Sequence, residues 1–371
     1  MSKKSFIEIV PIFFDGSLGI SDKEDYFLIP AKVASEMGYE SIILSTPAMD
    51  VGKLMQKKHK KVNKDIQIIH IQKWISYLRF LFQYKDAVIF ANDRVAKSFI
   101  ACFFGKHNIF MSHQSRLPKK WWQRKIFLFF VKKFDAIKVS NPFEKEELIK
   151  AGVKPERIHY IPLSIDHEFF SKKVSTQRKN EIRKKYNIQK DEKVLLFLAH
   201  VRKFKRIDTV LQAMHILREQ NIKVKLIIAG KDMLLNEKEK SIQEQAEQLG
   251  ITEQIVLTES ISQERAREIM NISDICVNSS IHEGQGLVVY EASSAGLPLC
   301  VSNIGSFTSV FTKSALFHNP DDARKLADNI QYYFKHPQIA KRHVTINKKI
   351  IKERCDYNIV TSKLKELFLK V

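Results

Sequence analysis

The sequence predicts an α/β protein built from two Rossmann-like, doubly wound parallel-sheet domains that face a central cleft. The chain has 371 residues, which is enough for two or three domains with large cores. Short apolar segments alternate with segments of helical period from one end of the chain to the other. Short strands that are apolar on both faces and are joined by helices are typical of parallel sheets, which bind ligands at the carboxyl ends of their strands.

The first half of the chain alternates seven expected strands with amphipathic segments. We therefore expect a first domain over residues 1–170. Its expected strands are Phe6–Phe14, Ser41–Ser45, Ile66–Ile71, Ala87–Ala91, Asn108–Ser112, Ala136–Ser140 and Ile158–Pro162, and its expected helices include Glu24–Met37, Arg94–Phe104 and Glu144–Ala151.

The second half repeats this alternation after a highly charged segment without apolar period, residues 171–190, which we expect to be the linker. The second domain is then expected over residues 191–352, followed by a C-terminal segment, 353–371. The expected strands are Val194–Ala199, Val224–Ala229, Ile255–Thr258, Ile275–Asn278, Leu299–Ser302 and Leu316–His318, and the expected helices include Ile207–Glu219, Glu237–Leu249, Ser262–Asn271 and Leu287–Ala295.

The composition is that of a folded globular protein, with 44% apolar and 28% charged residues. No apolar run approaches the roughly 18–20 residues that span a bilayer. The four cysteines are scattered and form no C-x-x-C pair, which favours a reducing cytosol over a disulfide or zinc framework.

The net charge of +21 is large, from 62 Lys and Arg residues against 41 Asp and Glu residues, and both halves of the chain share it. A surplus of this size favours an anionic partner: nucleic acid, anionic lipid or a phosphorylated substrate. The charge alone does not select one of the three.

The most informative segment, residues 279–296, joins an expected strand to an expected helix. Gly284 and Gly286 allow close backbone approach to a ligand, and the helix start offers unpaired N–H groups that suit a diphosphate. Glu283 and Glu291 could then accept hydrogen bonds from the hexose and the ribose of a nucleotide sugar. On these grounds alone, an incidental loop glutamate and an incidental helix glutamate explain the segment equally well.

This segment resembles the E-x7-E signature of the retaining glycosyltransferases of family 4, which have the two-domain GT-B fold. The resemblance is dense from Ala136 to Asp322 and specific for the family but not for the substrate. It also implies that a C-terminal helix, Tyr357–Leu369, packs back on the first domain. The other segments that carry the resemblance are Ala136–Gly152, Ile161–Phe170, Phe197–Asp208, Asp274–Ser280 and Ala295–Ser302.

The resemblance implies a role for each matching residue. Glu283 would contact hydroxyls of the donor sugar, and Glu291 the ribose diol. Arg202 and Lys205 would hold the diphosphate and stabilise the negative charge that develops as it leaves. The expected catalytic residues are thus Glu283, Arg202, Lys205 and, in the first domain, His113, and the expected donor-binding residues are Glu291, Gly284, Gly286, Leu287, Val288 and Gly16.

Some positions depart from the family pattern. The spacing from Arg202 to Lys205 is three where five is usual, and Gln285 replaces an aromatic residue between the two glycines. His113 matches a family histidine that faces the transferred sugar, but a satisfied histidine at a strand end is the alternative. Gly16 stands where the family has a glycine-rich loop, and an ordinary turn is the alternative there.

The expected mechanism needs no metal and no cofactor other than the nucleotide-sugar co-substrate, because two fixed cations hold the diphosphate. We find no D-x-D carboxylate pair, and Asp321–Asp322 is better explained as a helix cap. A retaining transfer would pass through an oxocarbenium-like state. Since no carboxylate of the first domain is placed as a nucleophile, we expect same-face substitution, with the departing phosphate taking the acceptor's proton.

A basic and aromatic segment lies in the first domain, without an acidic residue from Gln114 to Val131. A basic helix with aromatic residues fits an element in the plane of a membrane surface, where each basic residue near an anionic leaflet contributes about 1 kcal/mol. The alternative is that its apolar side packs on its own sheet and its lysines face water. The residues expected at the membrane surface are Lys119, Lys120, Trp121, Trp122, Arg124 and Lys125.

The sequence therefore predicts a retaining, metal-independent glycosyltransferase that moves a sugar from a nucleotide-diphosphate sugar to a glycan or lipid-linked acceptor. We expect it to act as a peripheral protein on the cytoplasmic face of the membrane. The alternatives are a nucleotide-sugar epimerase or phosphorylase on the same scaffold, or a basic nucleic-acid-binding protein. No RRM, KH or zinc-finger pattern is present, so no nucleic-acid partner is expected.

Overall fold

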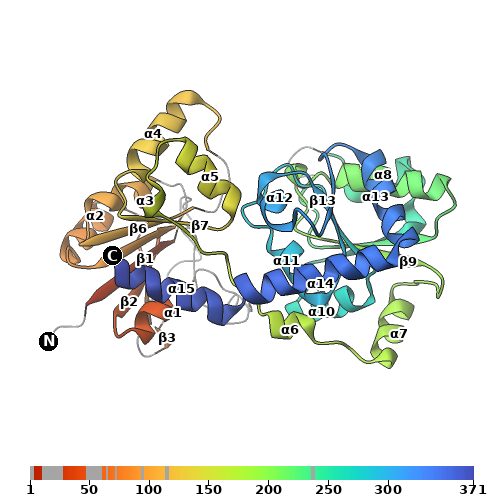
Figure 1. The fold of residues 1–371 in the computed structure, drawn as a ribbon, viewed down its shortest axis with the longest axis horizontal. Coiled ribbons are helices and arrows are strands. Elements are labelled where there is room, and N and C mark those ends of the chain that lie inside the picture. The colour runs from red at the N-terminus through yellow and green to blue at the C-terminus, as the bar shows by residue number, and fades with distance from the viewer. Residues whose placement is uncertain are drawn as a thin grey trace. The chain divides into compact units, whose positions relative to one another are not determined.

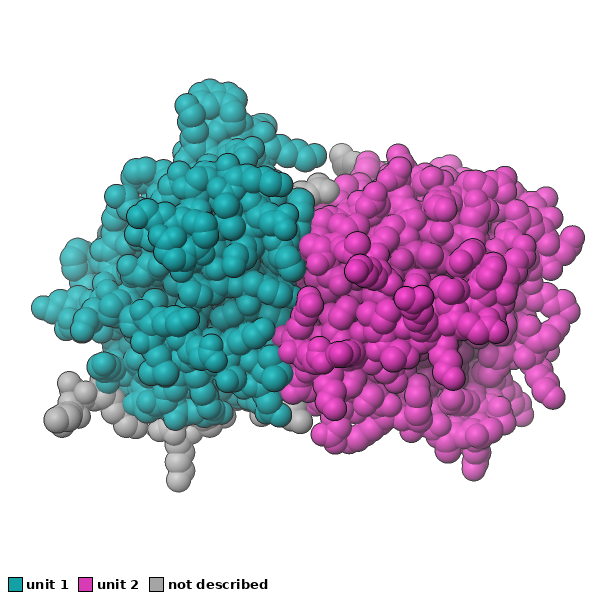
Figure 2. All heavy atoms as spheres, in the orientation of Figure 1, with its two compact units in different colours: residues 1–164, 357–371 teal, residues 165–356 magenta. Residues whose placement is uncertain are grey.

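The structure of the protein is a computed structural model, and it describes residues 4–10, 28–46, 61–63, 66–71, 73–92, 96–112, 117–234 and 239–371. The chain folds into two compact units (Figures 1 and 2). Unit 1 consists of residues 1–164 and 357–371, and unit 2 consists of residues 165–356. Each unit is built on a mainly parallel sheet covered by helices, as the sequence predicts.

The sheet of unit 1 has the strands β1 (Ser5–Val10), β2 (Glu40–Ser45), β3 (Lys61–Asn63), β4 (Ile66–His70), β5 (Val88–Asn92), β6 (His107–Ser112), β7 (Ala136–Val139) and β8 (Ile158–Tyr160). Their order is β3-β4-β2-β1-β5-β6-β7-β8, and only β3 pairs antiparallel with its neighbour. The helices of unit 1 are α1 (Ile29–Glu36), α2 (Trp74–Gln83), α3 (Ala96–Ile100), α4 (Trp121–Val131), α5 (Pro142–Lys150) and α15 (Tyr357–Lys370), with a short 3-10 helix η1 (Ala101–Phe103) after α3.

The two faces of this sheet bury different helices, because successive side chains of a strand point to opposite faces. Ile7 and Phe110 belong to the core that packs against α2, α4 and α5. Phe6 and Phe90 contact Phe368 of α15, with ring centroids 5.0 and 6.1 Å from that of Phe368. The last helix of the chain therefore belongs to unit 1. It begins at Tyr357, four residues after the expected start of the C-terminal segment.

Unit 2 has the strands β9 (Lys193–Leu198), β10 (Val224–Ala229), β11 (Ile255–Thr258), β12 (Ile275–Asn278), β13 (Leu299–Ser302) and β14 (Leu316–His318). They are all parallel, in the order β11-β10-β9-β12-β13-β14. The helices of unit 2 are α6 (His167–Ser171), α7 (Thr176–Lys185), α8 (Ile207–Glu219), α9 (Ile242–Gln248), α10 (Gln263–Ile272), α11 (Leu287–Ala295), α12 (Gly305–Phe311), α13 (Ala323–Lys335) and α14 (Pro337–Arg354).

Each strand expected from the sequence is present, although β1 is described only as far as Val10. The short edge strand β3 was not expected, because it lies at the end of a strongly basic stretch. No helix within the described ranges is long and apolar enough to cross a membrane.

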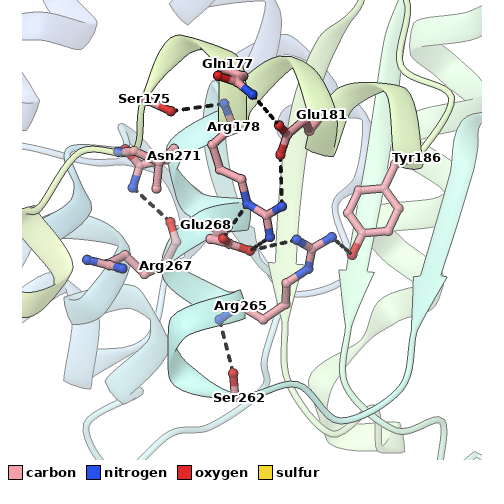
Figure 3. Close-up of polar contacts among 11 residues, drawn as sticks. Ser175, Gln177, Arg178, Glu181, Tyr186, Ser262, Arg265, Arg267, Glu268 and Asn271 are labelled. Carbon is pink, nitrogen blue, oxygen red and sulfur yellow. Dashed lines mark hydrogen bonds and ion pairs between the residues drawn. The ribbon is translucent and has the colours of Figure 1, made fainter.

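The expected linker over residues 171–190 is wrong for most of its length, because α7 occupies it and belongs to unit 2. Arg178 of α7 donates hydrogen bonds of 2.7 and 3.0 Å to the two carboxylate oxygens of Glu268 on α10 (Figure 3). On its other side, α7 buries Ile182 in the core of unit 2. The first boundary between the units accordingly falls after Ser164 and not after residue 170.

Candidate functional site

The loop from β9 to α8 carries the predicted phosphate-binding residues. A 3-10 helix, η3 (Lys203–Lys205), places Arg202 before it and Lys205 at its end. Arg206 follows with a φ of 50°, the left-handed conformation, and from there the chain enters α8. Its guanidinium donates hydrogen bonds to Asp208 in the first turn of α8, the shortest of them 2.9 Å long. The loop thus stands at the carboxyl end of β9, where parallel sheets bind ligands.

The loop from β12 to α11 carries the first glutamate of the signature. The side chain of Asn278 accepts a 3.0 Å hydrogen bond from the Ser280 N–H, which turns the chain at the end of the strand. The Ser280 hydroxyl donates a 2.7 Å hydrogen bond to Oε1 of Glu283. Gln285 is buried between the two glycines of this loop. The carboxylate of Glu283 is therefore held in place by its own loop.

The start of α11 requires a glycine at position 286. Gly286 has a φ of 75°, and a Cβ atom on it would lie 2.6 Å from Cε1 of Phe307. No side chain of the described residues caps α11, whose first turn begins with Leu287 and Val288 and follows the loop that contains Gly284. An uncapped helix start with its positive dipole end is suited to an anion.

Three contacts join these two loops across the neighbouring strands β9 and β12. The Lys205 ammonium donates a 2.6 Å hydrogen bond to Oε1 of Glu283. The N–H of Ile281 donates a 2.8 Å hydrogen bond to the carbonyl of Phe204. The rings of Phe204 and His282 stack with centroids 4.6 Å apart. Sequence reasoning missed the last pair, whose only signal is that each residue precedes a predicted site residue.

Glu291, the second glutamate of the signature, lies in the second turn of α11 and is partly buried. Burial raises the pKa of its carboxyl to about 7. It forms neither a hydrogen bond nor an ion pair with any residue that the structure describes. A carboxylate in such surroundings can accept hydrogen bonds from a ligand.

A cavity of about 670 Å³ opens beside Arg202, within unit 2. Four cationic side chains and two carboxylates contribute to its wall, so its field favours anions. The residues that line it are Arg202, Lys203, Arg206, Ile207, Asp208, Leu234, Glu239, Lys240, Gln245 and Ile281.

Helix α4 presents an exposed face that is both basic and aromatic. Phe127 and Val131 anchor its other face in the core of unit 1. Trp121 is 69% and Trp122 is 46% exposed, and the ammonium of Lys125 lies 5.0 Å from the ring centroid of Trp121. Helix α4 projects from unit 1 at the top of the view in Figure 1. The predicted residues Lys119, Lys120, Arg124 and Lys125 are all exposed.

Two predicted residues of the first domain, His113 and Gly16, lie outside the described residues, so their roles stay predictions. Within the described ranges, no group of three or more His, Cys, Asp or Glu side chains is arranged to hold a metal ion.

Two family models match the chain, one in each unit. Residues 39–169 match the model described as Glycosyltransferase Family 4, and residues 178–350 match Glycosyl transferases group 1. Mannosylfructose-phosphate synthase of Agrobacterium fabrum is 28% identical over 218 residues, which are 56% of this chain and 47% of that protein. Alpha-monoglucosyldiacylglycerol synthase of Streptococcus pneumoniae is 29% identical over 171 residues, 46% of this chain and 38% of that protein. The chain thus spans less than half the length of the curated relatives it matches.

The fold itself matches solved structures over the whole chain. The structure of Anabaena HepE in complex with UDP aligns with a TM-score of 0.78 at 14% identity, and the alignment covers 100% of each chain. The two family models together match most of the chain, and this likeness of fold agrees with them. The chain belongs to the family 4 glycosyltransferases of the GT-B fold.

Proposed function

We propose that the protein is a retaining glycosyltransferase that moves a sugar from a nucleoside-diphosphate sugar to a glycan or lipid-linked acceptor at the cytoplasmic face of a membrane. The observation that carries the proposal is the joined pair of loops at the carboxyl ends of β9 and β12. There Lys205 and Glu283 meet beside the uncapped start of α11. A cation, a carboxylate and a helix N-terminus together fit a phosphate with a polyol attached to it.

The donor is expected to lie across the loops of unit 2. Its diphosphate would bind the first turn of α11 and the cations Arg202 and Lys205, and its sugar hydroxyls would reach Glu283. The ribose diol would donate hydrogen bonds to Glu291, which is partly buried and makes none with the described residues. HepE, which shares the fold, was solved with UDP and with UDP-glucose, and this supports a nucleotide-sugar donor.

The proposed reaction breaks the bond between the anomeric carbon and the diphosphate oxygen. The electron pair stays on the diphosphate, whose new charge Arg202 and Lys205 stabilise without a metal ion. The acceptor hydroxyl oxygen bonds the anomeric carbon on the face that the diphosphate leaves, so the configuration is retained. The acceptor proton moves to the departing phosphate oxygen, and no side chain has to act as the base.

The acceptor is proposed to be presented at a membrane, because α4 exposes two tryptophans among cations on unit 1. Tryptophan rings fit the headgroup region, and lysines are attracted to anionic lipid. None of the exposed cations Lys119, Lys120, Arg124 and Lys125 forms an ion pair within the described ranges. The relative from Streptococcus pneumoniae is named as a synthase of alpha-monoglucosyldiacylglycerol, which supports a lipid acceptor here.

The first test is a pair of substitutions in the signature. Glu283→Ala and Glu291→Ala should each lower the rate of transfer by roughly 10² or more, since each removes a charged group expected to contact the donor. Product formation with the best donor from a panel of nucleotide sugars is the measurement. That donor is the one that raises the melting temperature most, because a ligand at 100 times its dissociation constant adds about 2.7 kcal/mol to stability.

A matched control is Glu219→Ala, which removes an exposed glutamate at the far end of α8 and should leave transfer unchanged. Full activity in both signature variants would contradict the assignment. Incubation with the donor alone separates transfer from epimerisation, since an epimerase converts the donor without an acceptor. A phosphorylase would consume the donor only when inorganic phosphate is present.

A further inference from the structure

The cation expected on the diphosphate, Lys205, and the carboxylate expected on the sugar, Glu283, form an ion pair with each other. Lys205 and Glu283 are only 17% and 11% exposed, and their contact is 2.6 Å long. Solvent screens a contact of this burial less than it screens an exposed ion pair. The Ser280 hydroxyl also donates to Oε1 of Glu283, so both hydrogen bonds converge on the same oxygen.

The surrounding contacts fix this geometry. The backbone hydrogen bond from Ile281 to Phe204 and the stack of Phe204 on His282 lie next to the ion pair. The ammonium of Lys205 also lies 5.2 Å from the ring centroid of Phe204. The two loops are therefore already docked, and a change of hydrogen-bond partner by Lys205 or Glu283 requires only side-chain movement.

We propose that Lys205 and Glu283 form a latch, which the sugar of the donor opens and which closes again once the sugar has left. Sugar hydroxyls that donate to Glu283 compete with Lys205 for the carboxylate, and Lys205 is then free to donate to the diphosphate. After transfer, Glu283 recovers Lys205 and weakens the hold of the site on the nucleoside diphosphate. The latch rests on the proposed function, and it adds that Glu283 promotes product release.

The latch predicts that loss of the Glu283 charge strengthens binding of the nucleoside diphosphate. Loss of a residue that only binds the ligand would weaken it. Glu283→Gln keeps the shape and the acceptor for Ser280 but removes the charge that holds Lys205. Titration calorimetry with UDP, GDP and ADP should show that the diphosphate bound by the wild-type protein binds about tenfold tighter to this variant. The same variant should lose transfer, because its Gln holds the sugar hydroxyls less well.

A double-mutant cycle separates the latch from a general electrostatic effect. Lys205→Met should weaken binding of the diphosphate, and adding Glu283→Gln to Lys205→Met should then have no measurable effect. The control is Asp191→Asn, which removes the carboxylate of an exposed ion pair in unit 2 that does not line the cavity, 2.6 Å from the Lys223 ammonium. Its effect on diphosphate affinity should be small.

Each outcome has a distinct meaning. Equal affinity of the wild-type protein and Glu283→Gln for the diphosphate would overturn the latch and leave the proposed function intact. Equal tightening in Asp191→Asn and Glu283→Gln, or tightening that persists without Lys205, would also overturn it. If none of the three diphosphates binds the wild-type protein or any variant, the proposed donor site fails and the latch fails with it. Melting temperatures of all variants check that each is folded.

Discussion

The two site loops of unit 2, from β9 to α8 and from β12 to α11, differ from helix α4 of unit 1 in how their charged side chains are paired. In the loops, Lys205 is paired with Glu283, and Arg206 with Asp208. On α4, exposed cations lie among exposed tryptophan rings and form no ion pair within the described part of the chain. Paired charges give the loops a defined shape, whereas the exposed cations of α4 are available to the anionic membrane surface that we propose as a partner.

The largest effect on the free energy of unfolding is expected from a substitution on the buried face of α4, compared with one on its exposed face. Phe127 is 2% exposed, and Phe127→Ala should lower the free energy of unfolding by about 3–5 kcal/mol through loss of burial and a cavity. Trp122→Ala should change it by less than about 0.5 kcal/mol, because the ring is 46% exposed. The same Trp122→Ala should reduce binding to vesicles of anionic lipid several-fold. Urea denaturation and vesicle sedimentation measure the two quantities.

Tyr332→Ala is the control for the vesicle experiment, since Tyr332 is 42% exposed but lies on α13 of unit 2. It should leave vesicle binding unchanged. If Trp122→Ala also binds vesicles as the wild-type protein does, α4 is not a membrane element and its exposed face needs another partner. If Trp122→Ala instead destabilises the protein as much as Phe127→Ala, the exposed face of α4 is packed.

The alternation of apolar segments was enough to predict both sheets, because strands of a parallel sheet are apolar on both faces. All four residues of β12 are buried, for example, and this strand was predicted with its observed bounds. Helix α7 was missed, because Ile182 is its one buried side chain among charged neighbours. A single apolar residue produces no helical period.

The candidate site residues of unit 2 were proposed from the sequence one by one, but their contacts with one another could not be predicted. That Lys205 reaches Glu283 depends on β9 and β12 being neighbours in the sheet, although β10 and β11 separate them in the sequence. The stack of Phe204 on His282 has the same origin. A sequence motif identifies residue types and spacing, whereas contacts between distant loops follow from strand order.

A smaller effect on stability, which depends on pH, is expected at Glu291. Unlike Glu283, Glu291 forms no ion pair with the described residues. The pKa of Glu291 is raised by burial to about 7, so the folded protein keeps a proton that the unfolded chain loses near the ordinary value of 4.5. The stability that this proton provides is fully present below pH 4.5 and is lost as the pH rises to about 7. Glu291→Gln should remove this loss and stabilise the protein at pH 8 by up to about 2–3 kcal/mol relative to wild type.

Unfolding by urea at several pH values between 5 and 8 tests this, with Glu219→Ala as the control for general effects of charge. A difference between Glu291→Gln and wild type that does not grow with pH would show that the carboxylate is solvated. Donor affinity should follow the opposite trend, because the ribose diol needs the ionised carboxylate. In the wild-type protein it should rise as the pH passes 7, and in Glu291→Gln it should not.

The smallest effect is expected at α7, where the charges are paired but exposed. Arg178 contacts Glu268 and Glu181, yet its side chain is 44% exposed, so Arg178→Ala should lower the free energy of unfolding only slightly, and less still at high salt. The side chain of Lys184 on the same helix forms no ion pair within the described ranges. Lys184→Ala should therefore leave the free energy of unfolding measurably unchanged. Equal stability of the two variants at low salt would mean that the network of Figure 3 does not hold α7 on α10. The burial of Ile182 alone would then attach α7 to unit 2, since exposed ion pairs lose in side-chain entropy and screening much of what they gain in attraction.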